Sequence, residues 1–410
     1  MKNIKKPLLS VVATSRNDGH GGNALWRTQH FVNGLAAQAL KFEFPIELVL
    51  VDWNPPIDKK GLFEALDWPE KNSYFSYRVI QVPHEYHNKF KFSDKLPLFQ
   101  YIAKNVGIKR ASGDYILSTN IDILFSNELM QFLKTELKPG YLYRVDRYDT
   151  DLKETVSPFL PFEEILKISQ HNVVRVNAKI QTIPYSTFIK RHPFFNTHIY
   201  IIFFSLIDAI RIILRYIWKV LIKITYVTRP LVVKSILNPW KIPKHIKMCW
   251  NELLNDGKKF FSYLKNVCRV VRSPTKAFHT NACGDFTLLS KDDWEKLKGY
   301  PEWELYSWHI DSVLIYQAYH NSIKMNNLPT SHAIFHIEHG QGSGWTPEGA
   351  NLLFDRLKKQ GISYMSDDDL ADEFEKQKKL QKQNKPVVYN DDNWGAPDVQ
   401  FPERGSLEKA

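Results

Sequence analysis

The chain has 410 residues, of which 43% are hydrophobic and 13% aromatic, so it is long and apolar enough to bury a large core. This composition excludes a chain that is disordered over most of its length. The cysteines Cys249, Cys268 and Cys283 have no CxxC spacing. That argues against a disulfide framework or a cysteine zinc site and fits a reducing compartment.

The net charge of +11 is concentrated in one segment. Residues 190–275 hold 16 Lys or Arg against three acidic residues, whereas the rest of the chain holds 39 bases and 41 acids. We therefore expect a basic insertion in an otherwise ordinary, enzyme-like body.

The first 135 residues alternate between short apolar runs and helical periodicity. The expected strands are 8–14, 46–51, 75–82 and 115–119, and the expected helices are 24–41 and 98–110. This alternation predicts an α/β fold with a doubly wound, mostly parallel sheet. A globular pattern resumes at about residue 276, and a charged helix is expected at 367–384.

Polar side chains follow three of the expected strands. They are Arg16, Asn17 and Asp18 after the first strand, Asp52 after the second, and Asn120 and Asp122 after the fourth. Ligands of doubly wound sheets bind beyond these strand ends, so three such clusters favour a nucleotide pocket. The alternative is that these residues cap loops, as Asn and Asp often do.

Asp122 is also placed to bind a divalent cation, directly after a buried strand. Hard cations prefer carboxylate oxygen, and manganese-like ions accept imidazole as well. His336 and His339 in FHIEHG are three residues apart and are candidate imidazole ligands. The alternative is that they are two ordinary surface histidines.

Several stretches in order resemble a known family. Arg16-Asn17, Asn105-Val106-Gly107 and Asn120-Ile121-Asp122 are similar to an Arg-Asn loop, an Asn-Val-Gly helix segment and an Asp-x-Asp motif. The stretch from Gly284 to Pro301 resembles a Gly-Gly, Ser-Lys and Gly-Phe-Pro series, and Trp308-His309-Ile310-Asp311 resembles Trp-Gly-x-Glu-Asp. These are motifs of metal-dependent β-1,4-galactosyltransferases and their chondroitin-synthesising relatives, within the GT-A inverting and family-2-like glycosyltransferases.

The resemblance covers residues 8–145 and 276–345. It implies a GT-A fold and transfer of a hexose from a UDP-sugar to an acceptor hydroxyl, with inversion. It implies that Asp311 is the general base, and that Gly284, Asp285 and Trp308 contact the acceptor. The implied donor-binding residues are Arg16, Asn17, Asp18, Asp52, Asn120 and Asp122, and the implied ligands of Mn²⁺ or Mg²⁺ are Asp122, His336 and His339.

The chain departs from the family at two places. Asn120 stands where the family has the first Asp of Asp-x-Asp, which leaves one carboxylate for the cation. His309-Ile310 replaces Gly-Glu before the base, so the identity of the acceptor is not carried over.

The resemblance and the composition together predict four segments. Residues 1–189 are expected to be the nucleotide-sugar-binding half of the GT-A domain and 276–350 the acceptor-binding and catalytic half. Residues 190–275 are expected to be a basic amphipathic helical insertion, and 351–410 a C-terminal helix followed by an extended tail.

The insertion has the pattern of a helix that lies on a membrane. Residues 200–227 are nearly all apolar apart from five charged residues that share one arc of a helix. These are Asp208, Arg211, Arg215, Lys219 and Lys223. The uncharged runs are too short to span a bilayer, so we expect peripheral attachment to an anionic membrane surface on the cytoplasmic face. A glycan or lipid-linked acceptor suits that location.

Other interpretations stay open. The insertion is alternatively a helical subdomain packed on the core; nucleic acid is a poorer partner, because helix-turn-helix and zinc-finger spacings are absent. A sugar nucleotidyltransferase is an alternative enzyme, although the loop 17–22 resembles its glycine-rich loop only loosely. Asn120 favours a third interpretation, a non-catalytic membrane-docking protein on a degenerate transferase fold.

Overall fold

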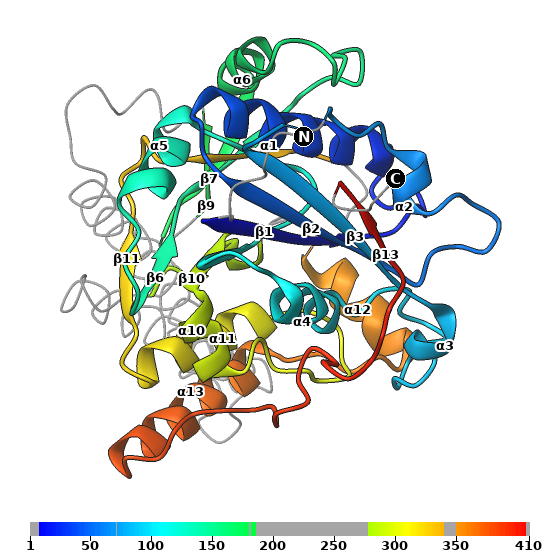
Figure 1. Cartoon of the computed structure of the whole chain (residues 1–410). Coiled ribbons are helices and arrows are strands. Elements are labelled where there is room, and N and C mark those ends of the chain that lie inside the picture. Colours follow the sequence, from blue (N-terminus) through cyan, green and yellow to red (C-terminus); the bar gives the residue numbers. More distant parts are fainter. Residues whose placement is uncertain (1–7, 71, 180–181, 186–277, 340–349, 407–410) are drawn as a thin grey trace, which may run out of the picture. The chain divides into compact units, whose positions relative to one another are not determined.

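The computed structural model describes residues 8–70, 72–179, 182–185, 278–339 and 350–406 (Figure 1). Contacts divide the chain into two units, Met1–Phe188 with Phe278–Ala410, and Ile189–Ala277. The insertion predicted at 190–275 and the helix predicted within it lie outside the described residues. The account below concerns the first unit.

The first unit is mixed α/β and is built on an eight-stranded sheet of order β11-β6-β10-β4-β1-β2-β3-β13. All of its strands except β10 and β13 run in one direction, so the predicted α/β class with a largely parallel sheet is confirmed. The strands are β1 Leu9–Ser15, β2 Ile46–Trp53, β3 Phe75–Val82, β4 Tyr115–Ser118, β6 Tyr141–Arg144, β10 Thr287–Ser290, β11 Lys324–Asn327 and β13 Glu403–Gly405.

A second sheet has five strands in the order β5-β12-β7-β8-β9. The strands are β5 Ile123–Phe125, β7 Arg147–Thr150, β8 Val173–Asn177, β9 Thr182–Pro184 and β12 Ile334–Ile337. β12 lies between β5, to which it is antiparallel, and β7, to which it is parallel. The sequence analysis does not predict this sheet.

Helices cover both faces of the eight-stranded sheet (Figure 1). They are α1 Ala24–Lys41, α2 Leu62–Ala65, α3 His84–His87, α4 Gln100–Arg110, α5 Asn127–Thr135, α6 Phe162–His171, α10 Lys291–Leu297, α11 Ile310–His320, α12 Ala350–Gln360 and α13 Asp367–Lys382, with a 3₁₀ turn at Cys283–Asp285. In β1, Val11 packs in the cluster that includes α1 and Val12 in the cluster that includes α4. Burial on both faces explains why β1 and β2 are mostly apolar and buried at every position.

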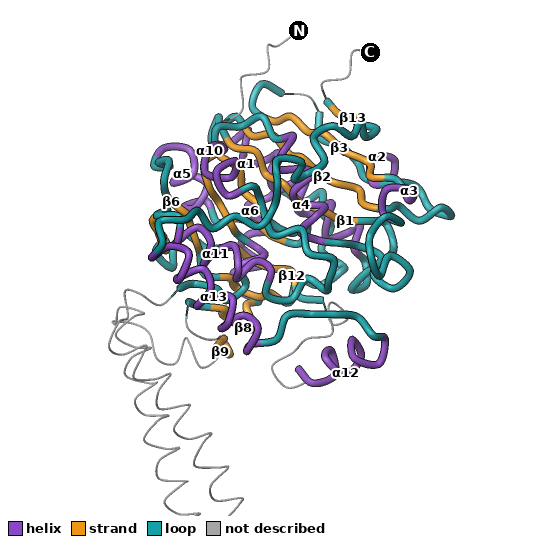
Figure 2. Tube along the Cα trace, turned by 90° about the horizontal axis from the view of Figure 1, so that it is seen from below, coloured by secondary structure: helices purple, strands orange, loops and turns teal. Residues whose placement is uncertain are grey.

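α4 lies close against β1 because of Gly107. A Cβ at that position would stand 2.5 Å from Cγ1 of Val12, so a larger residue would push the helix away from the sheet. Figure 2 looks onto the face of the sheet that α4 and α11 cover. This close packing sets the position of Lys104, whose role is described below.

The segment after α13 is packed against the sheet and the helices. β13 pairs antiparallel with β3 at the edge of the eight-stranded sheet. Val387, Trp394 and Phe401 are buried, and their apolar burial holds the segment in place. The charged helix expected at 367–384 is α13, Asp367–Lys382.

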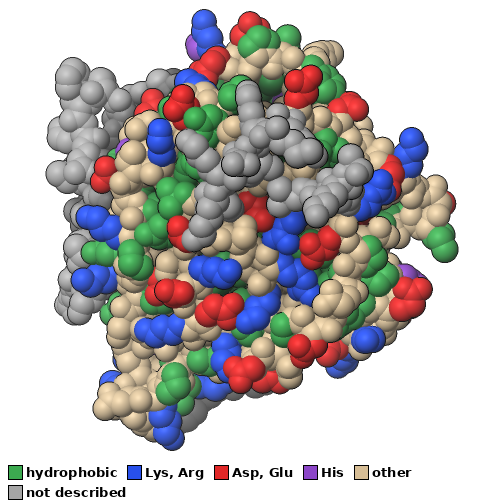
Figure 3. All heavy atoms as spheres, viewed as in Figure 1, with side chains coloured by type: hydrophobic (Ala, Val, Ile, Leu, Met, Phe, Trp, Pro, Cys, Tyr) green, Lys and Arg blue, Asp and Glu red, His purple; other side chains and the backbone are tan. Residues whose placement is uncertain are grey.

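Charges of both signs are mixed on the face that Figure 3 presents. Ion pairs of the described residues include Lys109–Glu295 and Lys298–Asp392, both at 2.8 Å. Among the helices in the described part of the chain, none has the length and apolar character needed to cross a membrane.

Candidate functional site

One carboxylate and two imidazoles lie close together next to β5 and β12 of the five-stranded sheet. Asp122 lies between β4 and β5, His336 lies in β12, and His339 follows it. Oδ2 of Asp122 is 3.2 Å from Nε2 of His339 and 3.7 Å from Nε2 of His336. The three ligand atoms lie within 4.8 Å of one another, so the group is able to hold a metal ion. The three residues expected as cation ligands are thus brought together.

The carboxylate of Asp122 is buried and only partly satisfied. Asp122 is 6% exposed, and its Oδ1 has no hydrogen-bond partner among the described residues. Burial favours the protonated form, but His336 and His339 hold the pKa of Asp122 well below its ordinary value. A buried carboxylate with one oxygen toward two imidazoles and the other without a partner among the described residues fits a divalent cation.

The pKa of His336 is shifted in the opposite direction. Burial and the nearby Arg147 lower it, but Asp122 and Asp149 outweigh them and raise the pKa to about 10. In the absence of a cation, His336 therefore carries two ring protons near neutral pH. A cation that binds there must displace one of them, so its binding competes with protons.

Arg27 of α1 lies beside this cluster, and the sequence analysis does not predict it. Arg27 is 3% exposed, and its Nε is 3.8 Å from Oδ2 of Asp122. Its guanidinium donates to the carbonyl oxygens of residues 20–22 and so fixes the loop after β1. Gly21 has a φ of 69°, and a Cβ there would lie 2.6 Å from Nδ1 of His339. Glycine is required where this loop packs on the cluster.

Asn120 is the centre of a buried hydrogen-bond network. Its Oδ1 accepts from Nζ of Lys104 and from Nε2 of Gln100, each at 2.9 Å, and its Nδ2 donates to Oδ1 of Asp285. An amide is suited to this position because it accepts at one end and donates at the other. The antiparallel pairing of β10 with β4 brings the two turns together. The side chain expected to contact the donor is thus engaged within the protein.

Lys104 of α4 is fully buried and is a second residue that the sequence analysis misses. Its Nζ donates to the carbonyl oxygen of Gly284 at 2.8 Å as well as to Asn120. Burial lowers its pKa to about 8, and the carboxylates of Asp285 and Asp311 oppose a larger change. Lys104 therefore ties the turn that precedes Asp122 to the turn that precedes β10.

Asp311, expected as the general base, and Gly284, expected to contact the acceptor, lie close together. A Cβ added to Gly284 would stand 3.1 Å from Oδ2 of Asp311 and 2.7 Å from Oη of Tyr101. Asp311 lies in the first turn of α11, where unpaired backbone N–H groups favour a carboxylate. Trp308 packs against the rings of His309 and Phe354 nearby.

Both carboxylate oxygens of Asp285 accept hydrogen bonds from side chains of the network. Asn120 donates to its Oδ1, and Nη1 of Arg147 donates to its Oδ2. With both oxygens engaged and only 4% of the residue exposed, Asp285 serves the network in this structure rather than an open surface.

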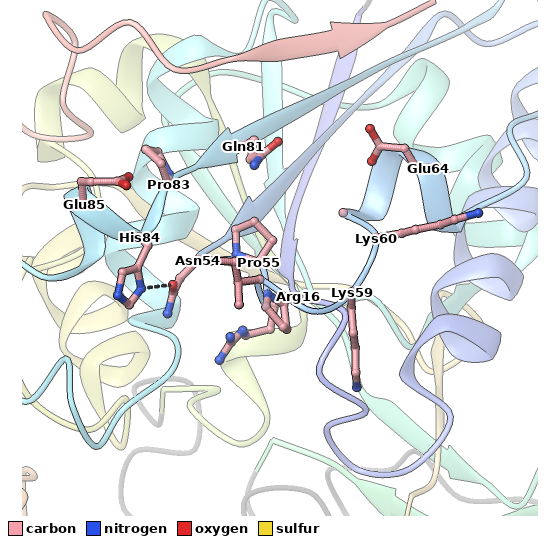
Figure 4. Close-up of a pocket in the computed structure, with 13 residues that line it drawn as sticks. Arg16, Asn54, Pro55, Lys59, Lys60, Glu64, Gln81, Pro83, His84 and Glu85 are labelled. Atoms are coloured by element: carbon pink, nitrogen blue, oxygen red, sulfur yellow. Dashed lines mark hydrogen bonds between the residues drawn. The ribbon is translucent and has the colours of Figure 1, made fainter.

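A pocket of about 780 Å³ lies at the carboxyl ends of β1, β2 and β3 (Figure 4). Its lining includes Arg16 after β1, Asn54 after β2, His84 after β3, and the loop residues Lys59 and Lys60. Nδ1 of His84 lies 2.9 Å from Oδ1 of Asn54, which joins two of these strand ends. The lining carries three basic side chains, Arg16, Lys59 and Lys60, against two acidic ones, Glu64 and Glu85, and this excess of positive charge favours an anionic ligand.

The predicted donor-binding residues after β1 lie at or near this pocket. Arg16 lines it, with Nη1 3.5 Å from Oδ2 of Asp18. Asn17 donates to the carbonyl oxygen of Lys60 at 3.0 Å and so supports the lysine loop. Asp18 accepts from the backbone N–H of His20 at 2.9 Å, which extends the loop toward the carboxylate–imidazole cluster.

Asp52, in contrast, lies behind the pocket wall. It is 1% exposed, and its Oδ2 accepts from the backbone N–H of Leu62 at 2.8 Å, while Oδ1 has no partner within the described residues. Burial raises its pKa from the ordinary 3.8 to about 6. Its visible role is to support Gly61 and Leu62, next to the pocket.

Comparison of the chain with protein-family models and with curated proteins finds no match. The case for a function therefore depends on the geometry of the site and on the motifs in the sequence.

We predict that Asp52→Asn changes the pH dependence of stability. The folded state binds the Asp52 proton more tightly than the unfolded state, because the folded pKa of about 6 exceeds the ordinary 3.8. The wild-type free energy of unfolding thus falls as pH rises from about 4 to 6, by up to about 3 kcal/mol from this group. The amide of the variant does not ionise, so the stability of Asp52→Asn relative to wild type should rise over that range. Urea titrations at pH 4 and pH 8 measure the difference, and an equal difference at both pH values would contradict the prediction.

We predict that Asn120→Asp harms the protein, although it restores the Asp-x-Asp pattern. In the variant, the amide that donates a hydrogen bond to Asp285 is lost. The carboxylate that replaces it lies next to the carboxylate of Asp285, which has the same charge. We expect a loss of about 1–3 kcal/mol in unfolding free energy and no gain in Mn²⁺ affinity. The double variant with Asp285→Asn should recover part of the loss, because one amide–carboxylate pair is restored. A stable Asn120→Asp variant that binds Mn²⁺ more tightly would refute this account of Asn120.

Proposed function

We propose that this chain is a glycosyltransferase with a GT-A-type catalytic domain, which transfers a hexose from a UDP-sugar to a hydroxyl of a glycan or lipid-linked glycan. The observation that carries the proposal is the cluster of Asp122, His336 and His339 beside a basic pocket at neighbouring strand ends. The loop after β1 connects them, since Arg16 lines the pocket and Gly21 packs against His339.

The charges of the site suit a nucleotide-sugar donor. Arg16, Lys59 and Lys60 at the pocket are complementary to a phosphate-containing ligand. The carboxylate–imidazole cluster would hold the divalent cation, and the two imidazoles favour Mn²⁺ over Mg²⁺. When bound, such a cation supplies Lewis-acid stabilisation of the departing diphosphate.

Asp311 is the proposed general base. Its carboxylate has the chemistry to accept the proton of an attacking acceptor hydroxyl, and its Oδ2 lies next to Gly284, a residue that the motifs assign to the acceptor. Lys104 donates hydrogen bonds to both Gly284 and Asn120. It thereby holds the proposed acceptor residues close to the turn that carries Asp122, a proposed ligand of the cation. A single displacement with Asp311 as base inverts the anomeric carbon, in line with the family that the motifs resemble.

A nucleotide-sugar panel with and without Mn²⁺ tests the proposal, together with Asp311→Asn. We expect transfer or donor hydrolysis only with Mn²⁺ and a UDP-sugar. Asp311→Asn should lower turnover by about 100-fold or more and leave UDP binding nearly unchanged, because it removes only the base. The matched control is Asp292→Asn, which removes an exposed acid from the first turn of α10. An Asp311→Asn variant with more than about a tenth of wild-type turnover would remove Asp311 from this role.

The same incubations separate the rival functions. A sugar nucleotidyltransferase would release pyrophosphate from UTP and a sugar 1-phosphate, which a glycosyltransferase does not. A non-catalytic docking protein would neither hydrolyse nor transfer any donor of the panel.

Membrane attachment at the cytoplasmic face is a separate part of the proposal, carried by the sequence of residues 190–275 alone. We expect the protein to sediment with anionic vesicles and much less with neutral ones, because apolar insertion and basic charge act together. Replacing Arg211, Arg215, Lys219 and Lys223 by Gln should release much of it. Equal recovery in the supernatant with and without anionic vesicles would exclude the attachment.

A further inference from the structure

We propose that Asp149 is a positioning residue that orients the imidazole of His336, so that Nδ1 faces Asp149 and Nε2 faces the cation. This inference rests on the cation site of the proposed function. It concerns a residue of β7 that no motif of the sequence indicates.

The backbone places Asp149 next to His336. β12 and β7 are parallel neighbours, and their register sets His336 directly opposite Asp149. On its other side β12 pairs with β5, where His336 is opposite Ile123, and the backbone N–H of Ile337 donates to the carbonyl oxygen of Asp122 at 2.9 Å. Asp122 directly before β5, His336 in β12 and Asp149 in β7 thus lie in a row.

The side chains follow the same order. Nε2 of His336 is 3.7 Å from Oδ2 of Asp122, and Nδ1 is 3.3 Å from Oδ1 of Asp149. Among the described residues, Nδ1 has no closer acidic partner than Asp149, since Oε2 of Glu338 lies 3.8 Å away. The imidazole therefore spans two carboxylates and directs a different ring nitrogen at each.

Asp149 is itself unsuited to hold the cation. Nε of Arg147 lies 2.8 Å from its Oδ1, and Nη1 of Arg175 lies 3.3 Å from its Oδ2. Nδ2 of Asn177 also donates to Oδ2 at 2.9 Å, and the side chain is completely buried. A cation at this carboxylate would face two guanidinium groups at short range. Of the two carboxylate–histidine groups that share His336 among the described residues, the one with Asp122 is the better cation site.

A fixed carboxylate behind a ligand imidazole has a known physical effect. It accepts the remaining ring proton, which fixes the tautomer and the ring plane and makes the other nitrogen a stronger ligand. The arginines and Asn177 hold Asp149 in place, so the carboxylate does not have to be ordered when the cation binds. Removal of such a partner typically weakens metal binding by about 10–100-fold.

Glu338 provides a matched comparison. Its Oε2 lies 3.8 Å from Nδ1 of His336, on the same side as Asp149, but its side chain is 34% exposed. Glu338→Gln and Asp149→Asn each remove one negative charge from that side of His336. If the loss of a negative charge alone lowers cation affinity, both variants should bind the cation more weakly. If the orientation of the imidazole matters, Asp149→Asn should bind it much more weakly than Glu338→Gln.

The test is an Mn²⁺ titration of the full-length wild type, Asp149→Asn and Glu338→Gln, followed by electron paramagnetic resonance, with thermal unfolding of the cation-free proteins as a check on folding. We expect Asp149→Asn to weaken Mn²⁺ binding by about 10–100-fold and Glu338→Gln by less than about threefold. Mn²⁺ affinity of folded Asp149→Asn within about threefold of wild type, or equal loss in both variants, would overturn the inference. Absence of Mn²⁺ binding by the wild type would overturn the cation site itself, which is a different result.

A measurement on the wild type covers the case in which Asp149→Asn does not fold. Nitrogen-15 resonances of the imidazoles in protein loaded with ¹¹³Cd²⁺ report which ring nitrogen bears the metal, and the signals of His336 are assigned by their loss in His336→Gln. We expect coupling of cadmium to Nε2 and a proton on Nδ1. Cadmium on Nδ1 would overturn the inference.

Discussion

The pairing of β12 between β5 and β7 is the constraint on which the site depends. These strands come from distant parts of the chain, and their register brings Asp122, His336 and Asp149 side by side. Backbone hydrogen bonds fix this arrangement, so the ligands need little further ordering. A shift of register by one residue would turn His336 to the opposite face of the sheet and remove it from both carboxylates.

A buried polar network connects this sheet to the larger one. Lys104 and Asp285 meet at Asn120, and Arg147 joins Asp285 to Asp149, which faces His336. Buried charges are tolerated only where partners satisfy them, and here basic and acidic groups alternate. The same alternation connects the turn at Gly284–Asp285 to the carboxylate–imidazole cluster, because Arg147 is shared between the carboxylates of Asp285 and Asp149. Loss of one member would leave its neighbour buried and unpaired, which costs more than the lost bond alone.

The sequence predicts the local elements and the ligand triad, but not the network. Periodicity alone locates the helix 24–41 and the strand 75–82, because amphipathic and buried apolar runs have their own signatures. Motif order predicts Asp122, His336 and His339 as ligands, and the structure brings them together. The order of the motifs does not predict that Arg147 and Asp149 lie beside the site. β7 is a short strand, and its place in the structure depends on pairing with residues nearly 190 positions later. Lys104 adjoins the Asn-Val-Gly segment, and Arg27 follows the glycine-rich loop, so both lie next to a motif that marks them as candidates. Nothing in the sequence indicates that they are buried.

Because Asn120 replaces a carboxylate, the binding of the cation and the binding of the donor should depend on each other in the proposed reaction. With Asn120 engaged by Lys104 and Asp285, the cluster offers the cation one carboxylate and two neutral imidazoles. A divalent ion would keep a net positive charge there, and Arg27 adds another charge 3.8 Å from Asp122. Such a site attracts a diphosphate more strongly than a site with two carboxylates, because less of the ion's charge is neutralised by the protein. Cation and donor should therefore bind cooperatively, with the phosphate oxygens as the ligands that the protein does not supply.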